Sequence, residues 1–167
     1  FRKMHVYEVP GERVLVLLTA GNLAISQSVA SGLKVQMGTA GEKSLASAPN
    51  LFSAAKIVGE AVRKVHERDA AALKEFGIEF NVSLILGGQI KGEEPRLFNI
   101  YAAGNFIEAT PETPYFQIGE SKYGKPVLDR VITPDTDLDE AAKCALVSMD
   151  STMKSNLSVG PPLDLVV

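Results

Sequence analysis

The sequence predicts an α+β fold of four layers, in which two mainly antiparallel sheets stack face to face between two helix pairs. Hydrophobic patterning along the 167 residues gives the order two strands, two helices, four strands, two helices and one strand. Short turns join successive strands, which favours antiparallel pairing. Each predicted helix has one apolar stripe, and stacked sheets with a helix pair outside each would bury all of these stripes.

The chain is predicted to begin with a hairpin. Residues 4–9 alternate in polarity up to a Pro-Gly-Glu turn, and residues 13–19 (Arg-Val-Leu-Val-Leu-Leu-Thr) are a run rich in leucine and β-branched side chains. We expect the second of these strands to be buried on both faces.

Two helices are predicted to follow this hairpin. Apolar residues recur every four positions over residues 25–37, and Asn22 is placed to cap that helix. After a polar loop, Asn50 can cap a longer helix that ends at Gly77, with its apolar face over residues 51–65.

The rest of the chain repeats strands and then helices. Strands are expected over residues 80–90, 96–102, 106–110, 115–118 and, at the end of the chain, 163–167. A short helix over residues 119–132 precedes a longer one over residues 138–154, which begins like a capping box at Asp137 and Glu140. Because the first residue is Phe1 and the last strand ends with the chain, we expect one domain over residues 1–167, truncated at both ends.

Composition argues against several classes of partner. Hydrophobic residues make up 46% and charged residues 22% of the chain, as in ordinary globular domains. A net charge of −3 without a basic stripe predicts no nucleic-acid partner, and no segment reaches the ~20 apolar residues that span a bilayer. The single cysteine, Cys144, cannot form an internal disulfide, which favours a reducing, cytoplasmic compartment.

Motifs for chemistry are few. His5 and His66 lie near no Gly-x-Ser-x-Gly motif, so a Ser-His-Asp triad is not predicted. Cys144 lies on the apolar side of a helix and is interpreted as structural. An acidic cluster lies at the start of the last helix, formed by Asp135, Asp137, Asp139 and Glu140. Helix capping and the helix dipole account for these residues, so we predict no metal and no cofactor.

Five short motifs are spread over essentially the whole chain. They are Phe1-Arg2-Lys3-Met4, Leu18-Thr19-Ala20-Gly21-Asn22, Leu86-Gly87-Gly88-Gln89-Ile90, Ala103-Gly104-Asn105-Phe106-Ile107-Glu108 and Gly119-Glu120-Ser121-Lys122-Tyr123-Gly124-Lys125-Pro126. Together they resemble the Anbu group of bacterial proteasome-type peptidases. That group resembles proteasome β subunits and HslV, which are N-terminal-nucleophile hydrolases with an αββα sandwich. The resemblance therefore implies the architecture that the element order predicts.

The resemblance also implies a threonine-type peptidase. In the family an N-terminal threonine attacks the peptide carbonyl, and a lysine that matches Lys3 keeps its amine and hydroxyl poised for proton transfer. The family's Ala-Gly after the next strand matches Ala20 and Gly21, and we expect the Gly21 N–H to form the oxyanion hole. No threonine heads this chain and the family's hairpin aspartate is missing, so these 167 residues by themselves are expected to be inactive.

Further site residues are implied by the same resemblance. The family's Gly-Ser-Gly matches Gly119-Glu120-Ser121, which leaves open whether Glu120 or Ser121 contacts the terminal amine. The Asp and Ser that brace the threonine fall on Ser155 and Ser158, so the aspartate is replaced. The remaining implied residues would line a mostly apolar substrate pocket; they are Phe1, Thr19 and Leu23.

The motifs are compatible with three functions. The leading hypothesis is a subunit of a homo-oligomeric ring or spiral that hydrolyses peptide bonds in peptides or unfolded proteins. The altered positions Glu120 and Ser155 favour an alternative, a non-catalytic or weakly catalytic structural or assembly subunit. An amidase or acylase of the wider hydrolase class fits the layers but lacks these motifs. An N-terminal threonine upstream of Phe1 would favour the first hypothesis.

Overall fold

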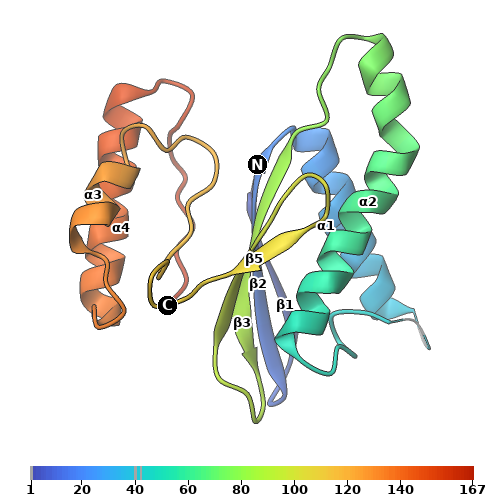
Figure 1. The fold of residues 1–167 in the computed structure, drawn as a ribbon, viewed down its shortest axis with the longest axis horizontal. Coiled ribbons are helices and arrows are strands. Elements are labelled where there is room, and N and C mark those ends of the chain that lie inside the picture. The colour runs from blue at the N-terminus through green and yellow to red at the C-terminus, as the bar shows by residue number, and fades with distance from the viewer. Residues whose placement is uncertain (1, 40, 42) are drawn as a thin grey trace. The chain divides into compact units, whose positions relative to one another are not determined.

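The computed structural model describes residues 2–39, 41 and 43–167, and the chain divides into two compact units, Phe1–Glu108 and Ala109–Val167. The first unit is an antiparallel sheet of order β1-β2-β3-β4-β5 with α1 and α2 on one face (Figure 1). The second unit contains α3 and α4. The strands are β1 (Met4–Val9), β2 (Arg13–Gly21), β3 (Val82–Ile90), β4 (Arg96–Ile100) and β5 (Phe106–Glu108), and the helices are α1 (Leu23–Gly38), α2 (Leu51–Glu75), α3 (Lys125–Val131) and α4 (Leu138–Ser155).

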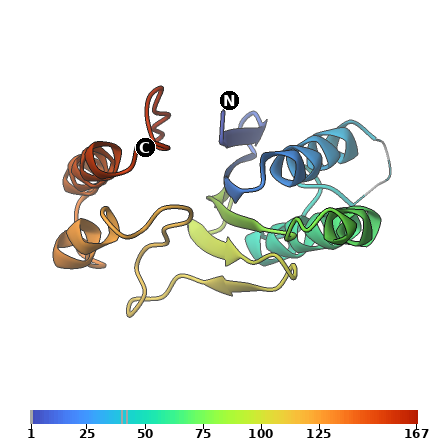
Figure 2. The same cartoon turned by 90° about the horizontal axis from the view of Figure 1, so that it is seen from above.

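Asparagines begin both helices of the first unit, as predicted. The Asn22 side chain accepts hydrogen bonds from the N–H groups of Ala24 at 3.0 Å and Ile25 at 3.4 Å. The Asn50 side chain accepts one from the N–H of Ser53 at 2.8 Å. Each such cap typically contributes ~1 kcal/mol to helix stability. Figure 2 shows the two helices side by side on the same face of the sheet.

The core of the first unit lies between the sheet and this helix pair. Along β2 the buried residues alternate with exposed ones, and Val14 and Leu18 are 47% and 37% exposed. The prediction that this strand is buried on both faces is therefore wrong, because its helix-facing residues alone are fully enclosed. The fully buried core includes Leu15, Leu17, Leu33, Leu84, Leu86, Phe98 and Ile100.

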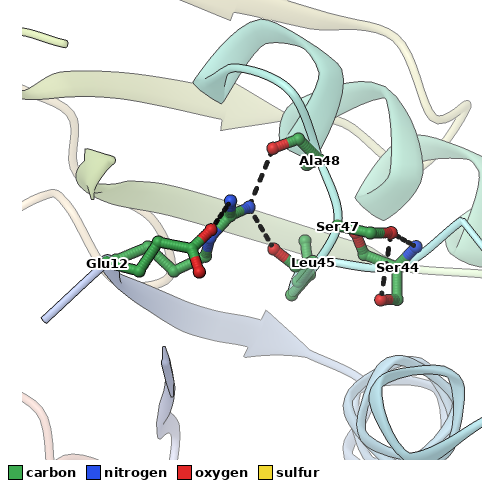
Figure 3. Close-up of polar contacts among 6 residues, drawn as sticks. Glu12, Ser44, Leu45, Ser47 and Ala48 are labelled. Carbon is green, nitrogen blue, oxygen red and sulfur yellow. Dashed lines mark hydrogen bonds and ion pairs between the residues drawn. The ribbon is translucent and has the colours of Figure 1, made fainter. Parts of the chain in front are cut away.

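A buried arginine fixes the loop that leads into α2. Arg13 donates through Nη1 to the carbonyl oxygens of Leu45 at 3.1 Å and Ala48 at 2.8 Å (Figure 3). Its Nη2 lies 2.6 Å from a carboxylate oxygen of Glu12. Since the guanidinium satisfies two carbonyls at once, it holds the start of α2 close to the start of β2.

The second unit is a helix pair, α3 and α4. Asp137 caps α4 by accepting the N–H of Glu140 at 2.8 Å, as predicted. Pro126 lies in the first turn of α3, so the helix begins at Lys125 rather than at residue 119. Cys144 is buried, with its sulfur 3.8 Å from the carbonyl oxygen of Val127. Along the described part of the chain, no helix has the length and apolarity needed to cross a bilayer.

Two predicted strands are absent. Residues 115–118 and 163–167 have no regular structure, and the described residues form one sheet where two were expected. A strand is stable only when a neighbouring strand takes up its backbone hydrogen bonds, and no described residue does this for either segment. The α+β class itself is confirmed.

Candidate functional site

Lys3 and Thr19 lie side by side where β1 begins and β2 ends. The N–H of Thr19 donates to the carbonyl oxygen of Lys3 at 2.9 Å, and the Thr19 hydroxyl lies 3.4 Å from the same oxygen. Thr19 is buried, whereas Lys3 is exposed. The structure therefore brings together the predicted lysine and one residue of the predicted substrate pocket.

Gly21 ends β2 in a conformation that requires glycine. Its φ of +98° lies in the left-handed region, and an added Cβ would come within 2.6 Å of the carbonyl oxygen of Asn81. Any side chain at this position would have to displace the start of β3. The identity of the residue is thus set by the backbone.

The direction of the Gly21 N–H follows from two hydrogen bonds on either side of it. The N–H of Asn22 donates to Asn81 on the β3 side at 2.8 Å, and the N–H of Thr19 donates to Lys3 on the β1 side. Backbone groups alternate along an antiparallel strand, so the Gly21 N–H points toward the β1 side, beyond Lys3. The position opposite it in this register is residue 1, which lies outside the described residues.

The other predicted pocket residues are only partly described. Leu23 is the first residue of α1 and is 45% exposed, close in sequence to the Asn22 cap. Phe1 lies outside the described residues. The pocket formed by Phe1, Thr19 and Leu23 therefore stays a prediction.

In the second unit, Glu120 and Ser158 are joined through Asn156. The amide nitrogen of Asn156 donates to Glu120 Oε2 at 2.8 Å. The amide oxygen of Asn156 accepts from the Ser158 N–H at 2.9 Å and from the Ser158 hydroxyl at 2.6 Å. The backbone N–H of Lys122 donates to Glu120 Oε1 at 2.8 Å. We call the three residues Glu120, Asn156 and Ser158 the asparagine bridge.

These contacts stabilise the charged form of Glu120. The N–H of Lys122, and next the amide of Asn156, lower the pKa of Glu120 below its ordinary value. Glu120 is therefore a carboxylate at neutral pH, and both of its oxygens accept hydrogen bonds. In this state it is suited to holding a positively charged group, such as an amine, rather than to donating a proton.

Sequence reasoning missed Asn156, because an uncharged amide carries no sign of proton chemistry. It is the C-cap of α4, where its backbone N–H bonds to the Thr152 carbonyl oxygen. Asparagine at the end of an amphipathic helix is a recognisable stop signal, so its position was predictable although its partners were not.

Ser121 and Ser155 do not join this bridge. The Ser121 carbonyl oxygen accepts from the N–H of Lys125 at 3.1 Å, at the start of α3. Ser155 is the exposed last residue of α4. Within the described residues, no hydrogen bond links either hydroxyl to Glu120 or Ser158.

The predicted site residues are thus divided between the two units. Lys3, Thr19 and Gly21 belong to the first, and the asparagine bridge belongs to the second. No cluster of three His, Cys, Asp or Glu side chains suited to a metal ion occurs among the residues that the structure describes.

Comparisons with known proteins identify relatives of the whole chain. A family model described as "Proteasome subunit" matches residues 77–167. Among solved structures, Anbu from Yersinia bercovieri is 55% identical with a TM-score of 0.90. Anbu from Hyphomicrobium sp. strain MC1 is 52% identical with a TM-score of 0.88, and the Pseudomonas aeruginosa protein, described as a helical assembly of the Anbu complex, is 51% identical with a TM-score of 0.92.

Each of these three alignments covers 97% of this chain but 66% of the other chain. The chain therefore spans slightly less than two thirds of the length of these relatives. A comparison with curated proteins found no match.

Proposed function

Because the chain belongs to the proteasome subunit family and has an Anbu-like fold, we propose that the protein is a threonine-type peptidase subunit. It hydrolyses peptide bonds in peptides or unfolded proteins. The nucleophile is an N-terminal threonine, a residue that the 167-residue chain does not contain at its start. The chain supplies the groups that surround this nucleophile.

The backbone at the end of β2 carries this proposal. The Gly21 N–H is directed past Lys3, and no Cβ obstructs the approach of a substrate carbonyl. A fixed N–H in this position stabilises the oxyanion that develops when a hydroxyl attacks a carbonyl carbon. Since α1 begins at Leu23, the positive end of its dipole lies close by and adds to this effect.

The steps of the reaction follow from these positions. The threonine oxygen bonds to the carbonyl carbon while its proton passes to the terminal amine, with Lys3 holding the amine and hydroxyl in place. The proton then goes to the leaving nitrogen as the peptide C–N bond breaks. Water hydrolyses the resulting ester and restores the threonine. No cofactor is required.

The other implied residues have supporting roles in this proposal. In the second unit, we propose that Glu120 and Ser158 act as one hydrogen-bonded group whose carboxylate can hold an amine. Ser121 and Ser155 are the less well supported members because neither joins the asparagine bridge. Thr19 and Leu23, together with Phe1, line the substrate pocket.

Assembly is the second part of the proposal. A relative that is 51% identical was solved as a helical assembly. We propose that this protein is likewise a cytoplasmic homo-oligomer, in a ring or spiral that keeps its sites away from folded proteins. Sedimentation velocity on the full-length protein tests this directly, and a monomer at all concentrations would contradict it.

One observation favours the alternative of a non-catalytic assembly subunit. Within the asparagine bridge, Asn156 already satisfies one Glu120 oxygen and the Ser158 hydroxyl, so the bridge is complete without a nucleophile. A subunit of this kind would keep the fold for assembly and would not react with substrate.

An active-site probe separates the two functions. The full-length protein is incubated with a peptide epoxyketone, and its intact mass is measured together with its N-terminal sequence. One adduct on an N-terminal threonine supports the peptidase. Lys3→Ala should abolish this adduct, and the control Lys64→Ala, on the exposed side of α2, should keep it. A different or blocked terminus without an adduct supports the assembly subunit.

A further inference from the structure

Asn156 fixes which atoms of the asparagine bridge donate hydrogen bonds and which accept them. The backbone N–H of Ser158 can only donate, so the Asn156 atom that lies 2.9 Å from it is the amide oxygen. The amide nitrogen therefore faces Glu120 and donates to its Oε2 at 2.8 Å. Since a carboxylate accepts this bond, the orientation of the amide is set at both of its ends.

This orientation determines what the Ser158 hydroxyl can do. An amide oxygen only accepts hydrogen bonds, so the 2.6 Å contact between the hydroxyl and Asn156 uses the single hydroxyl proton of Ser158. The oxygen keeps its lone pairs, and because Ser158 is exposed, a ligand can reach them. While the bridge is intact, Ser158 can therefore accept a hydrogen bond from a ligand but cannot donate one.

Glu120 is held as an acceptor in the same way. Its side-chain oxygens accept from Asn156 and from the N–H of Lys122. Its backbone carbonyl oxygen accepts from Gln117 Nε2 at 3.0 Å, which fixes the main chain at this residue. The carboxylate is only partly buried and keeps further lone pairs. A group with N–H donors, such as an amine, can satisfy the acceptors of Glu120 and Ser158, whereas a carbonyl or a carboxylate cannot.

We propose that Asn156 is a positioning residue of the peptidase, which makes the Ser158 hydroxyl an acceptor and aligns the Glu120 carboxylate, so that both are prepared for an amine. This inference rests on the proposed function, in which Glu120 and Ser158 have supporting roles. Asn156 acts through these two neighbours rather than on the substrate.

The variant Asn156→Asp separates this role from a purely structural one. Aspartate has nearly the same shape and keeps an oxygen that accepts from Ser158. The backbone N–H of residue 156 still donates to the Thr152 carbonyl oxygen at the end of α4. Only the donor to Glu120 is lost, because a second carboxylate takes its place. If residue 156 merely shaped the loop, this variant would behave like the unaltered protein.

The rate at which the full-length protein forms the epoxyketone adduct is the first readout. At about pH 8, Asn156→Asp and Asn156→Ala should each slow it about tenfold, the effect of losing one hydrogen bond to a charged group. The control is Lys154→Ala in the exposed last turn of α4, where Lys154 pairs with Asp150, and its rate should stay within about twofold. Circular dichroism checks that each variant is folded. Unchanged rates in both Asn156 variants would overturn the inference.

The pH dependence of Asn156→Asp is a readout that a structural role would not move. As the pH falls, two neighbouring carboxylates come to share one proton, which restores a hydrogen bond between residues 120 and 156. Lys122, the charged residue that acts on Glu120 within the described chain, is the same in every variant. The rate of Asn156→Asp relative to the unaltered protein should rise from about pH 8 to about pH 5. The ratio for Asn156→Ala should stay level, and equal behaviour of the two variants would contradict the role of the amide donor.

A mutant cycle tests whether Asn156 acts through its two neighbours. In a background that carries Glu120→Ala and Ser158→Ala, adding Asn156→Ala should change the rate by less than about twofold, because the groups that it positions are already absent. A further loss of about tenfold would show that Asn156 acts by another route, and the inference would be wrong.

These outcomes keep the inference distinct from the proposed function. If the unaltered protein forms no adduct, the peptidase is contradicted and the role of Asn156 falls with it. If the unaltered protein reacts and Asn156→Asp reacts equally fast at every pH, the peptidase stands and the inference alone is overturned.

Discussion

The two units stabilise their candidate site groups in different ways. In the first unit, a sheet covered by two helices holds the backbone of Lys3 and Gly21 above a core of fully buried side chains. In the second, α3 has no buried residue and α4 buries only Cys144, Ser148 and Thr152. Its site group is a set of side-chain hydrogen bonds at a helix end. The first unit thus positions backbone atoms through packing, and the second positions side chains through polar contacts.

This difference predicts that the first unit tolerates added volume least. A Cβ at Gly59 of α2 would collide with the carbonyl oxygen of Gly104, and neither backbone can move without disturbing the core. Gly59→Ala should lower the free energy of unfolding by about 3 kcal/mol, as overpacking of a core does. In Gly32→Ala on α1, where no atom lies within 4 Å, the same change should raise stability by up to ~1 kcal/mol. Urea denaturation measures both; equal effects would contradict the packing argument.

The corresponding change in the second unit should cost less. A Cβ at Gly124 would collide with the hydroxyls of Ser148 and Thr152, which are side-chain ends, and would lie 3.1 Å from the Ser148 carbonyl oxygen, a milder backbone contact than the one at Gly59. We expect Gly124→Ala to lower stability by about 1 kcal/mol, near the low end for overpacking. Gly160→Ala, in open space, is the control. If Gly124→Ala lowered the free energy of unfolding more than Gly59→Ala does, the claim that the first unit tolerates added volume least would be wrong.

The two units should also differ in how pH affects their stability, because burial shifts the pKa of Tyr7 in the first and hydrogen bonding shifts the pKa of Glu120 in the second. Burial raises the pKa of Tyr7 to about 12, from an ordinary value near 10. Because the unfolded chain loses this proton first, the contribution is complete below about pH 10 and is lost as the pH rises toward 12. Unfolding measured between these pH values should show a steeper loss for the unaltered protein than for Tyr7→Phe. Parallel curves would show that the phenol is not buried in solution.

In the second unit the pKa of Glu120 is shifted in the opposite direction, below its ordinary value. Asn156→Ala removes one of the hydrogen bonds that lower the pKa of Glu120, so the pKa should rise toward its ordinary value. The stability that Glu120 contributes is present above the pKa of the unfolded chain and is lost as the pH falls through the folded value. Carboxyl-detected NMR titration gives this pKa. Ser155→Ala, which lies outside the bridge, should leave it unchanged.

Local signals in the sequence predicted local structure well. Asn22, Asn50 and Asp137 were identified as helix caps because a cap involves residues only a few positions apart. Segments 115–118 and 163–167 were wrongly predicted as strands, since pairing depends on partners far away in the chain that patterning does not reveal. The same limit explains why burial alternates along β2 although residues 14–18 are all apolar.

The candidate site was predicted less completely than the fold. Gly21 came from a resemblance of motifs, and only the structure gives the physical reason for it, which is the contact with Asn81. Asn156 was missed because its importance lies in two partners, Glu120 and Ser158, that are brought together by folding. The place of β1 at one end of the described sheet likewise depends on strand order, which no single segment encodes.

A crystal structure of the full-length protein after reaction with a peptide β-lactone would decide whether the end of β2 forms an oxyanion hole. We predict an ester on an N-terminal threonine, with its carbonyl oxygen about 2.7–3.1 Å from the Gly21 nitrogen. Lys3 should lie next to the same threonine. An unmodified terminus, or an ester oxygen directed away from Gly21, would contradict the proposed peptidase.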